Sequence, residues 1–253
     1  MSVFIMMAIH LLVLYASYEI LRRHPWLVWG VFIVAPVLSI PLWLGGVSDW
    51  FLIAKTYTMA VAMLWFQATR SFQKLRTSKI MFGGLYLLLI INIIEAVFKD
   101  IQTGSYLNAF AGALLCITLP TIKDIIIDKD GKYNDVLWSM SKLWIVAYTI
   151  WNITFVLGNF PHGVGASSVL LAVPLIIGLF KPKIWAQVRA ITLATHLMMR
   201  IYFANYFERL SLPWMSEVVF FLPLLNGLQV VSLLLSIVCI GIVIFNKRKA
   251  VAF

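Results

Sequence analysis

Polar and ionisable side chains that interrupt long apolar segments are the residues of this sequence most able to do chemistry. The chain is 62% hydrophobic and only 12% charged. A charged side chain at the centre of a bilayer costs about 2.5–3.5 kcal/mol, so it needs a partner or a water-filled cavity. Six such residues form the candidate ligand-binding set: Lys55, Asn92, Glu95, Asn152, His196 and Arg200.

The polar residues around Glu95 share one face of a predicted helix. Asn92, Glu95 and Lys99 are three and four residues apart, the spacing at which helical side chains meet. One interpretation is that Lys99 neutralises Glu95. Lys55, in a neighbouring segment, has a stem long enough to carry its charge outward to the membrane surface. Both of these structural interpretations stand beside the ligand-binding one.

A second polar stripe runs along the segment 185–206. Arg189, Thr192, His196 and Arg200 are separated by three, four and four residues, so they lie on one helix face. A helix with such a face cannot turn it to lipid, and the stripe is expected to face the interior of a helix bundle. Arg189 is expected at the inner membrane surface. His196 and Arg200 are expected within the membrane, as ligand-binding or as packing residues.

The candidate set favours the binding of a small anionic or polar ligand. Lys55, Glu95, Asn152 and Arg200 are expected at one depth in the outer part of the membrane, where two bases exceed one acid. His196 is expected about one helical turn deeper, where its protonation can be linked to ligand movement. We predict no catalytic residue, no metal ligand and no cofactor, because soluble catalytic and nucleotide-binding motifs are absent from the sequence.

Two rival sites start from other residues. The run Gly165-Ala166-Ser167-Ser168 resembles the GxSG nucleophile motif of rhomboid proteases, with His196 as base, but Ser168 replaces the final glycine. The acidic residues in 124–135 are the only candidates for an enzyme acting at the membrane surface. They alternate with lysines, which predicts a solvated loop. The acidic residues are Asp124, Asp128, Asp130 and Asp135.

The apolar blocks predict an all-α fold, a polytopic transmembrane helical bundle that forms one domain over residues 1–253. Each block has about 18–22 residues, the length with which an α-helix crosses about 30 Å of hydrocarbon. The mean hydropathy of +0.94 agrees with this class. We expect about nine crossings, with eight as the alternative. The predicted spans lie near 2–21, 26–45, 50–70, 80–98, 105–125, 138–158, 165–180, 185–206 and 222–246.

The positions of the basic residues predict the orientation of these spans. Most of the 20 Lys and Arg residues fall in alternate joints, from Arg22-Arg23 to Lys247-Arg248-Lys249, while joints such as Gly45-Gly46 have none. Because cytoplasmic loops are rich in Lys and Arg, the N-terminus is expected outside and the C-terminus in the cytoplasm. The net charge of +10 is therefore mainly a topology signal, and no nucleic-acid partner is predicted.

Five short segments between residues 18 and 200 carry a resemblance to a known family. They are YEILRR at 18–23, KTY at 55–57, INIIEA at 91–96 with KD at 99–100, IVAYTIWN at 145–152 and WAQVRA at 185–190. These segments resemble an uncharacterised family of bacterial multi-pass membrane proteins, catalogued as a domain of unknown function. The resemblance implies a helical membrane bundle and implies no activity.

The sequence thus predicts a transporter or channel-like protein of a bacterial inner, or cytoplasmic, membrane, with a polar site that faces outward. The alternatives are an intramembrane enzyme that acts on a lipid-type substrate, and a non-catalytic sensor or assembly protein. The expected partners are membrane lipids and a small anionic ligand or protons. Self-association into a homo-oligomer is left open.

Overall fold

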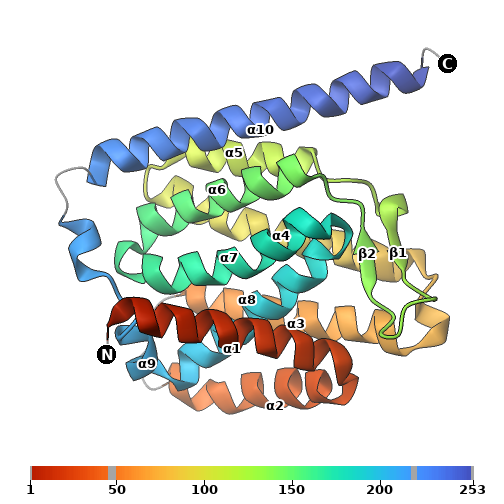
Figure 1. Ribbon diagram of the computed structural model, residues 1–253, viewed down its shortest axis with the longest axis horizontal. Coiled ribbons are helices and arrows are strands. Elements are labelled where there is room, and N and C mark those ends of the chain that lie inside the picture. The colour runs from red at the N-terminus through yellow and green to blue at the C-terminus, as the bar shows by residue number, and fades with distance from the viewer. Residues whose placement is uncertain (1, 45–49, 218–220, 252–253) are drawn as a thin grey trace.

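The computed structural model describes residues 2–44, 50–217 and 221–251 (Figure 1). In these residues the chain forms ten α-helices and one hairpin of two short strands. The helices are α1 (Val3–Arg23), α2 (Pro25–Leu44), α3 (Trp50–Ser71), α4 (Lys79–Gln102), α5 (Tyr106–Ile117), α6 (Lys142–Asn159), α7 (Val164–Phe180), α8 (Trp185–Tyr202), α9 (Ala204–Glu208) and α10 (Phe221–Val251). The strands are β1 (Ile125–Ile127) and β2 (Val136–Trp138). The all-α prediction is confirmed, and the predicted turn at Gly45-Gly46 lies outside the described residues.

Six of the described helices are long and apolar enough to cross a membrane. Hydrocarbon offers no water to backbone N–H and C=O groups, so segments of this composition adopt the α-helix, which satisfies those groups internally. These helices indicate a membrane protein. They are Val3–Arg23, Pro25–Leu42, Trp50–Ser71, Lys79–Gln102, Pro161–Phe180 and Phe221–Asn246.

Among the described residues, the helices that are long and apolar enough to cross a membrane are fewer than the nine predicted crossings. The helix α5 has 12 residues, or about 18 Å at 1.5 Å per residue, which is short of the hydrocarbon thickness. The helices α6 and α8 have 18 residues each, but polar residues such as Asn152, Arg189 and Arg200 lower their hydropathy. The number of crossings and their orientation therefore stay predictions.

The helix α8 lies at the centre of the bundle. It packs against α1, α3 and α7, while α10 lies along α5 and α6 on one side of the molecule (Figure 1). Most residues of α8 are buried, including Gln187, Arg189, Thr192 and His196. Arg189, Thr192 and His196 of the polar stripe thus face the bundle interior as expected, and Arg200 is half-buried.

An aromatic cluster fixes α8 against α6. The rings of Tyr148 and Trp185 meet edge to face with centroids 4.9 Å apart, and Trp144 stacks on Tyr148 at 5.4 Å. All three side chains are buried. Gly178 on α7 allows Trp185 to approach, because a Cβ atom there would lie 2.6 Å from the indole ring. This packing holds the polar stripe of α8 in one orientation.

The hairpin of β1 and β2 binds the ends of three helices. Asp135 accepts a hydrogen bond from Arg22 at 2.6 Å and one from Gln187 at 2.7 Å, and Arg70 lies 3.8 Å away. We call Arg22, Arg70, Asp135 and Gln187 the hairpin ion cluster. Asp135 is only 4% exposed, so the predicted solvated loop is wrong at this residue. The pairing of β1 with β2 brings it inward.

Opposing effects act on the Asp135 carboxyl. Burial raises its pKa, whereas the hydrogen bonds from Arg22 and Gln187 and the charges of Arg22 and Arg70 lower it, and the net pKa lies below its ordinary value. The carboxylate is therefore charged at neutral pH. It ties α1, α3 and α8 together at what we call the hairpin end of the bundle.

Candidate functional site

Lys55 and Glu95 form a buried ion pair between α3 and α4. The Nζ atom of Lys55 lies 2.9 Å from Oε2 of Glu95 and also donates to the backbone oxygen of Asn92 at 2.5 Å. The Thr58 hydroxyl donates to Oε1 of Glu95 at 2.7 Å. Both carboxylate oxygens are thus satisfied by residues of the bundle.

This pairing decides the two structural alternatives for these residues. The side chain of Lys55 is only 9% exposed, so it does not extend to the surface. Lys99 does not neutralise Glu95, because its Nζ atom lies instead about 6.0 Å from the ring centres of Trp50 and Phe160. Both alternative interpretations are wrong, and the charge of Lys55 stays inside the bundle.

The hydroxyl of Tyr148 on α6 gathers polar side chains from three helices. Arg189 Nε on α8 lies 3.2 Å from this oxygen. The Nδ2 atoms of Asn92 on α4 and Asn152 on α6 lie 3.4 and 3.5 Å from it. These separations are at the long end of hydrogen-bond geometry, so each contact is weak. The shared hydroxyl nevertheless brings three polar side chains together at one point.

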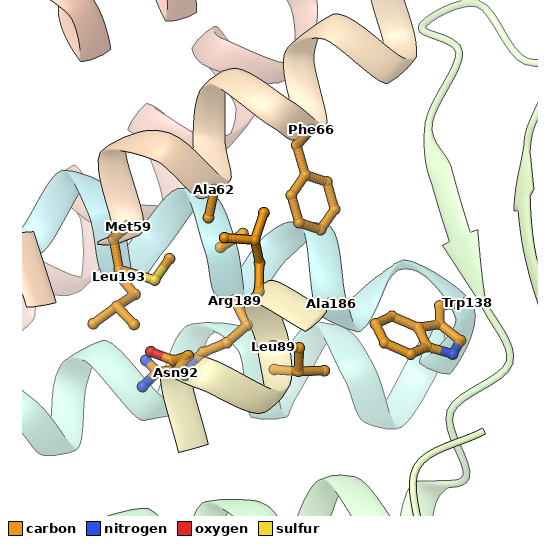
Figure 2. A pocket seen from close by; sticks show the side chains of 11 residues that line it. Met59, Ala62, Phe66, Leu89, Asn92, Trp138, Ala186, Arg189 and Leu193 are labelled. Carbon is orange, nitrogen blue, oxygen red and sulfur yellow. The ribbon is translucent and has the colours of Figure 1, made fainter. Parts of the chain in front are cut away.

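Arg189 is a buried cation without a carboxylate partner. It is 4% exposed, and its Nη1 atom makes no hydrogen bond within the described chain. No carboxylate of the described residues lies within ion-pair distance of its guanidinium. Figure 2 shows the side chain extending from α8 toward Asn92, whose Oδ1 atom makes no hydrogen bond to any described residue either. Buried charges are normally paired, so this arrangement is incomplete as it stands.

The polar side chains line one cavity of about 80 Å³, which we call the inner cavity. A space of this size holds a few water molecules or a small ion. The structure brings the predicted set together here, since Glu95 is the one member outside the lining and it is bound to Lys55. The polar lining residues are Lys55, Asn92, Asn152, Ser167, Arg189, His196 and Arg200.

A larger recess of about 470 Å³ adjoins the inner cavity. Ser167, His196 and Arg200 line both spaces, so they form the boundary between them. The recess is lined further by Glu208 of α9 and by His162 of the short 3₁₀ turn Pro161–Gly163. It therefore gives the inner cavity a polar approach on the side of the loops before α7 and after α8.

The space on the opposite side of Arg189 is small and apolar. A cavity of about 30 Å³ lies between α3, α4 and α8, with Asn92 and Arg189 in its wall and Met59, Phe66 and Trp138 around it (Figure 2). Trp138 belongs to β2, next to the hairpin ion cluster. Apolar side chains and the ion cluster thus close the bundle toward the hairpin end.

A pair of buried histidines joins α1 to α8 at the boundary between the recess and the inner cavity. His10 Nε2 lies 3.1 Å from His196 Nδ1, and the two residues are 0% and 3% exposed. Tyr206 and Phe207 of α9 pack their rings against His10, with centroids 5.6 and 5.4 Å away. We call His10 and His196 the histidine couple.

Asn108, a buried polar residue of α5, lies away from the inner cavity. Its Nδ2 atom donates to Asp100 at 2.7 Å and to the Trp151 backbone oxygen, and the Trp151 indole donates to the Asn108 backbone oxygen at 3.0 Å. Asn159 Nδ2 donates to the other oxygen of Asp100 at 2.7 Å. These residues connect α4, α5 and α6 and take no part in the inner cavity.

Four residues of the site were not in the predicted ligand-binding set, and one of them, Ser167, was considered only in the rival serine motif. The structure places the side chain of Arg189 in the cavity wall, and its place on the stripe of α8 was the signal for this, while its expected depth at the inner membrane surface stays a prediction. Tyr148 carries no charge and was therefore not selected, although it lies four residues before Asn152, on the same face of the helix. His10 is the one polar residue in the apolar run 3–14 of α1, and its partner is 186 residues away.

The fold and the site together define a class: a helical membrane protein with a buried, cationic polar cavity in its core. The chain belongs to the family of unknown function DUF5692, whose model matches residues 1–251. This confirms the resemblance to an uncharacterised family. Comparison with curated proteins gave no match, and comparison with solved structures gave none.

Proposed function

We propose that this protein is a transporter or channel-like protein that carries a small anion across a membrane and binds it in the inner cavity. Arg189 carries this proposal. Lys55 is balanced by Glu95, whereas the guanidinium of Arg189 has no carboxylate within ion-pair distance in the described residues. An anion in the inner cavity supplies the missing charge and accepts a hydrogen bond from Nη1.

The size and lining of the inner cavity support a small ligand. A volume of about 80 Å³ is far below the 300–1,000 Å³ of sites for drug-sized molecules. The Asn152 amide, the Ser167 hydroxyl and the Arg189 guanidinium all line it and can donate hydrogen bonds. Chloride, nitrate and phosphate fit this donor set, and a lipid headgroup with its chains does not.

The closed and open sides of the cavity support movement of the ligand. The recess of about 470 Å³ reaches the inner cavity at His196 and Arg200, whereas the opposite side ends in apolar residues and the hairpin ion cluster. Transporters bind their substrate near the middle of the membrane and open to one side at a time. We propose that this arrangement is the state in which the site faces outward.

We propose further that the protein lies in a bacterial cytoplasmic membrane. It crosses this membrane nine times, with the N-terminus outside and the C-terminus in the cytoplasm. Support for this topology comes from the basic joints at Arg22-Arg23 and Arg70–Lys79, which belong to the hairpin end or adjoin it. The polar helices α6 and α8 are surrounded by apolar ones, so they can cross without exposing Arg189 to lipid.

Hydrolysis inside the membrane is the alternative function to consider for the inner cavity, because Ser167 and His196 both line it. In a catalytic triad the Nδ1 atom of the base faces a carboxylate that stabilises the imidazolium. Here Nδ1 of His196 faces His10, which carries no negative charge. The geometry therefore favours binding over nucleophilic catalysis.

Uptake by proteoliposomes tests the proposal. The purified protein is reconstituted, and the entry of radiolabelled chloride, nitrate and phosphate is compared with that into empty vesicles. Wild-type protein is expected to carry at least one of these anions, Arg189→Gln to lose the uptake, and Arg23→Gln, at an exposed arginine, to keep it. Equal uptake by wild type and Arg189→Gln overturns the proposed site.

A second measurement separates transport from the rivals. Uptake of none of the three anions, together with covalent labelling of Ser167 by a fluorophosphonate, overturns transport in favour of hydrolysis. Anion binding without any uptake overturns it in favour of a sensor. Both measurements use the full chain, and elution of each variant as a single species in size-exclusion chromatography controls for folding.

A further inference from the structure

The histidine couple is a proton-binding unit with one hydrogen bond between two rings. Two neutral imidazoles share this bond only if one ring nitrogen donates and the other accepts. The bond uses Nε2 of His10, and the buried Nδ1 atom of the same ring makes no hydrogen bond within the described chain. Either tautomer therefore leaves one ring nitrogen without a partner, and the couple can take up a further proton without losing the bond between the rings.

The position of the couple links it to the path of a ligand. His196 lines both the recess and the inner cavity, so an ion that passes from one to the other passes this ring. His10 lies behind it, on α1, and is fully buried. His196 thus lies on the path of the ligand, and His10 lies behind it in the protein interior.

The charges around the couple make proton uptake depend on an anion. On α8 the couple faces Arg189 and Arg200, and on α3 Lys55 lines the same cavity. From α9 the phenol of Tyr206 packs on His10 and Glu208 lines the recess, as does His162 before α7. Lys55 is paired with Glu95, whereas Arg189 has no carboxylate within ion-pair distance in the described residues, so its positive charge beside the couple is not balanced. A protonated couple is repelled by it unless an anion lies in the inner cavity.

We propose that the histidine couple binds one proton together with each anion that enters the inner cavity, so that the protein carries anion and proton as a symporter. The inference rests on the proposed function. The proton comes from water in the recess, adds to the unprotonated ring nitrogen of the couple, and leaves when the anion leaves. A monovalent anion and a proton together move no net charge.

The test uses proteoliposomes with a pH-sensitive dye inside and a voltage clamped by potassium and valinomycin. An inward gradient of whichever anion is taken up, chloride, nitrate or phosphate, is expected to acidify the interior in step with uptake. His10→Gln and His196→Gln are expected to lose the acidification. His24→Gln, at an exposed histidine between α1 and α2 that lines neither the recess nor the inner cavity, is the matched control and is expected to keep it.

The outcomes separate this inference from the function on which it rests. Wild-type uptake without acidification overturns proton coupling and leaves anion transport standing. Acidification that persists in both His10→Gln and His196→Gln overturns the role of the couple. Absence of uptake by the wild-type protein overturns the proposed function and the symport with it. His10→Asn provides a second variant that keeps a polar side chain at the site if His10→Gln fails to fold.

Discussion

Lys55 Nζ lies 2.9 Å from Glu95 Oε2, and this contact joins α3 to α4 inside the bundle. Removal of one partner from a buried ion pair leaves the other charge unpaired, at a cost of about 3–5 kcal/mol. We therefore predict that Glu95→Gln destabilises the protein by about this amount. The free energy of unfolding in mixed micelles is the measurement.

The double variant Lys55→Met/Glu95→Gln is expected to recover much of that loss, because it removes both charges. Glu217→Gln provides the control, since Glu217 is exposed and makes no ion pair within the described residues, and its replacement is expected to stay within about 0.5 kcal/mol of wild type. Equal destabilisation by Glu95→Gln and Glu217→Gln would show that the pair is not buried as described.

The hairpin ion cluster gives a second prediction. Asp135→Asn removes the charge that holds Arg22 and Arg70, and we expect a loss of about 3–5 kcal/mol in the free energy of unfolding. Asp130→Asn, at an exposed position of the same hairpin, is expected to stay within about 0.5 kcal/mol of wild type. Hydrogen exchange at the Val136 amide, which donates to Gln187, is expected to accelerate only in Asp135→Asn.

The lowered pKa of Asp135 gives a third prediction, on pH. The carboxyl titrates at about 3.9 in the unfolded chain and lower in the folded one. Its contribution to stability is therefore complete above the unfolded value and is lost as pH falls through the folded value. Unfolding measured from about pH 6 to about pH 3 is expected to show this loss in wild type and a smaller one in Asp135→Asn. Identical pH dependence in both proteins would contradict the charge assignment.

The Tyr148 hydroxyl gives a fourth prediction. Tyr148→Phe leaves Arg189 Nε, Asn92 and Asn152 without their common acceptor, and unsatisfied buried donors cost about 1–3 kcal/mol. We expect a destabilisation in that range and weaker binding of the transported anion, because the guanidinium is held less firmly. Tyr86→Phe is the control, since the Tyr86 hydroxyl makes no hydrogen bond within the described chain. Unchanged anion affinity in Tyr148→Phe would remove Tyr148 from the site.

The sequence predicts much of the site because a membrane makes polar residues expensive. Lys55, Asn152 and Arg200 stand out in apolar segments, and the structure brings all three to the inner cavity. The partners of such residues are harder to predict, since they depend on packing between distant segments. Two examples are the hydrogen bond between His10 and His196 and the ion pair of Glu95, which forms with Lys55 and not with Lys99.

Asp135 and α8 show why burial and membrane crossing cannot always be predicted from the composition of a segment. Asp135 stands among lysines and aspartates that are typical of a solvated loop, and only the pairing of β1 with β2 buries it. In α8 the polar stripe that marks the site also lowers the hydropathy by which a crossing is recognised. A helix that other helices surround on all sides does not need the apolar composition of one that faces lipid.

Anomalous diffraction from crystals of the protein soaked in bromide can show whether the inner cavity binds an anion, because bromide can be located without knowledge of the natural ligand. We expect a bromide peak in the inner cavity at hydrogen-bond distance from Arg189 Nη1, and no such peak in crystals of Arg189→Gln. A wild-type cavity that holds no bromide, with a carboxylate of the protein against the Arg189 guanidinium, would show that Arg189 does not bind an anion there.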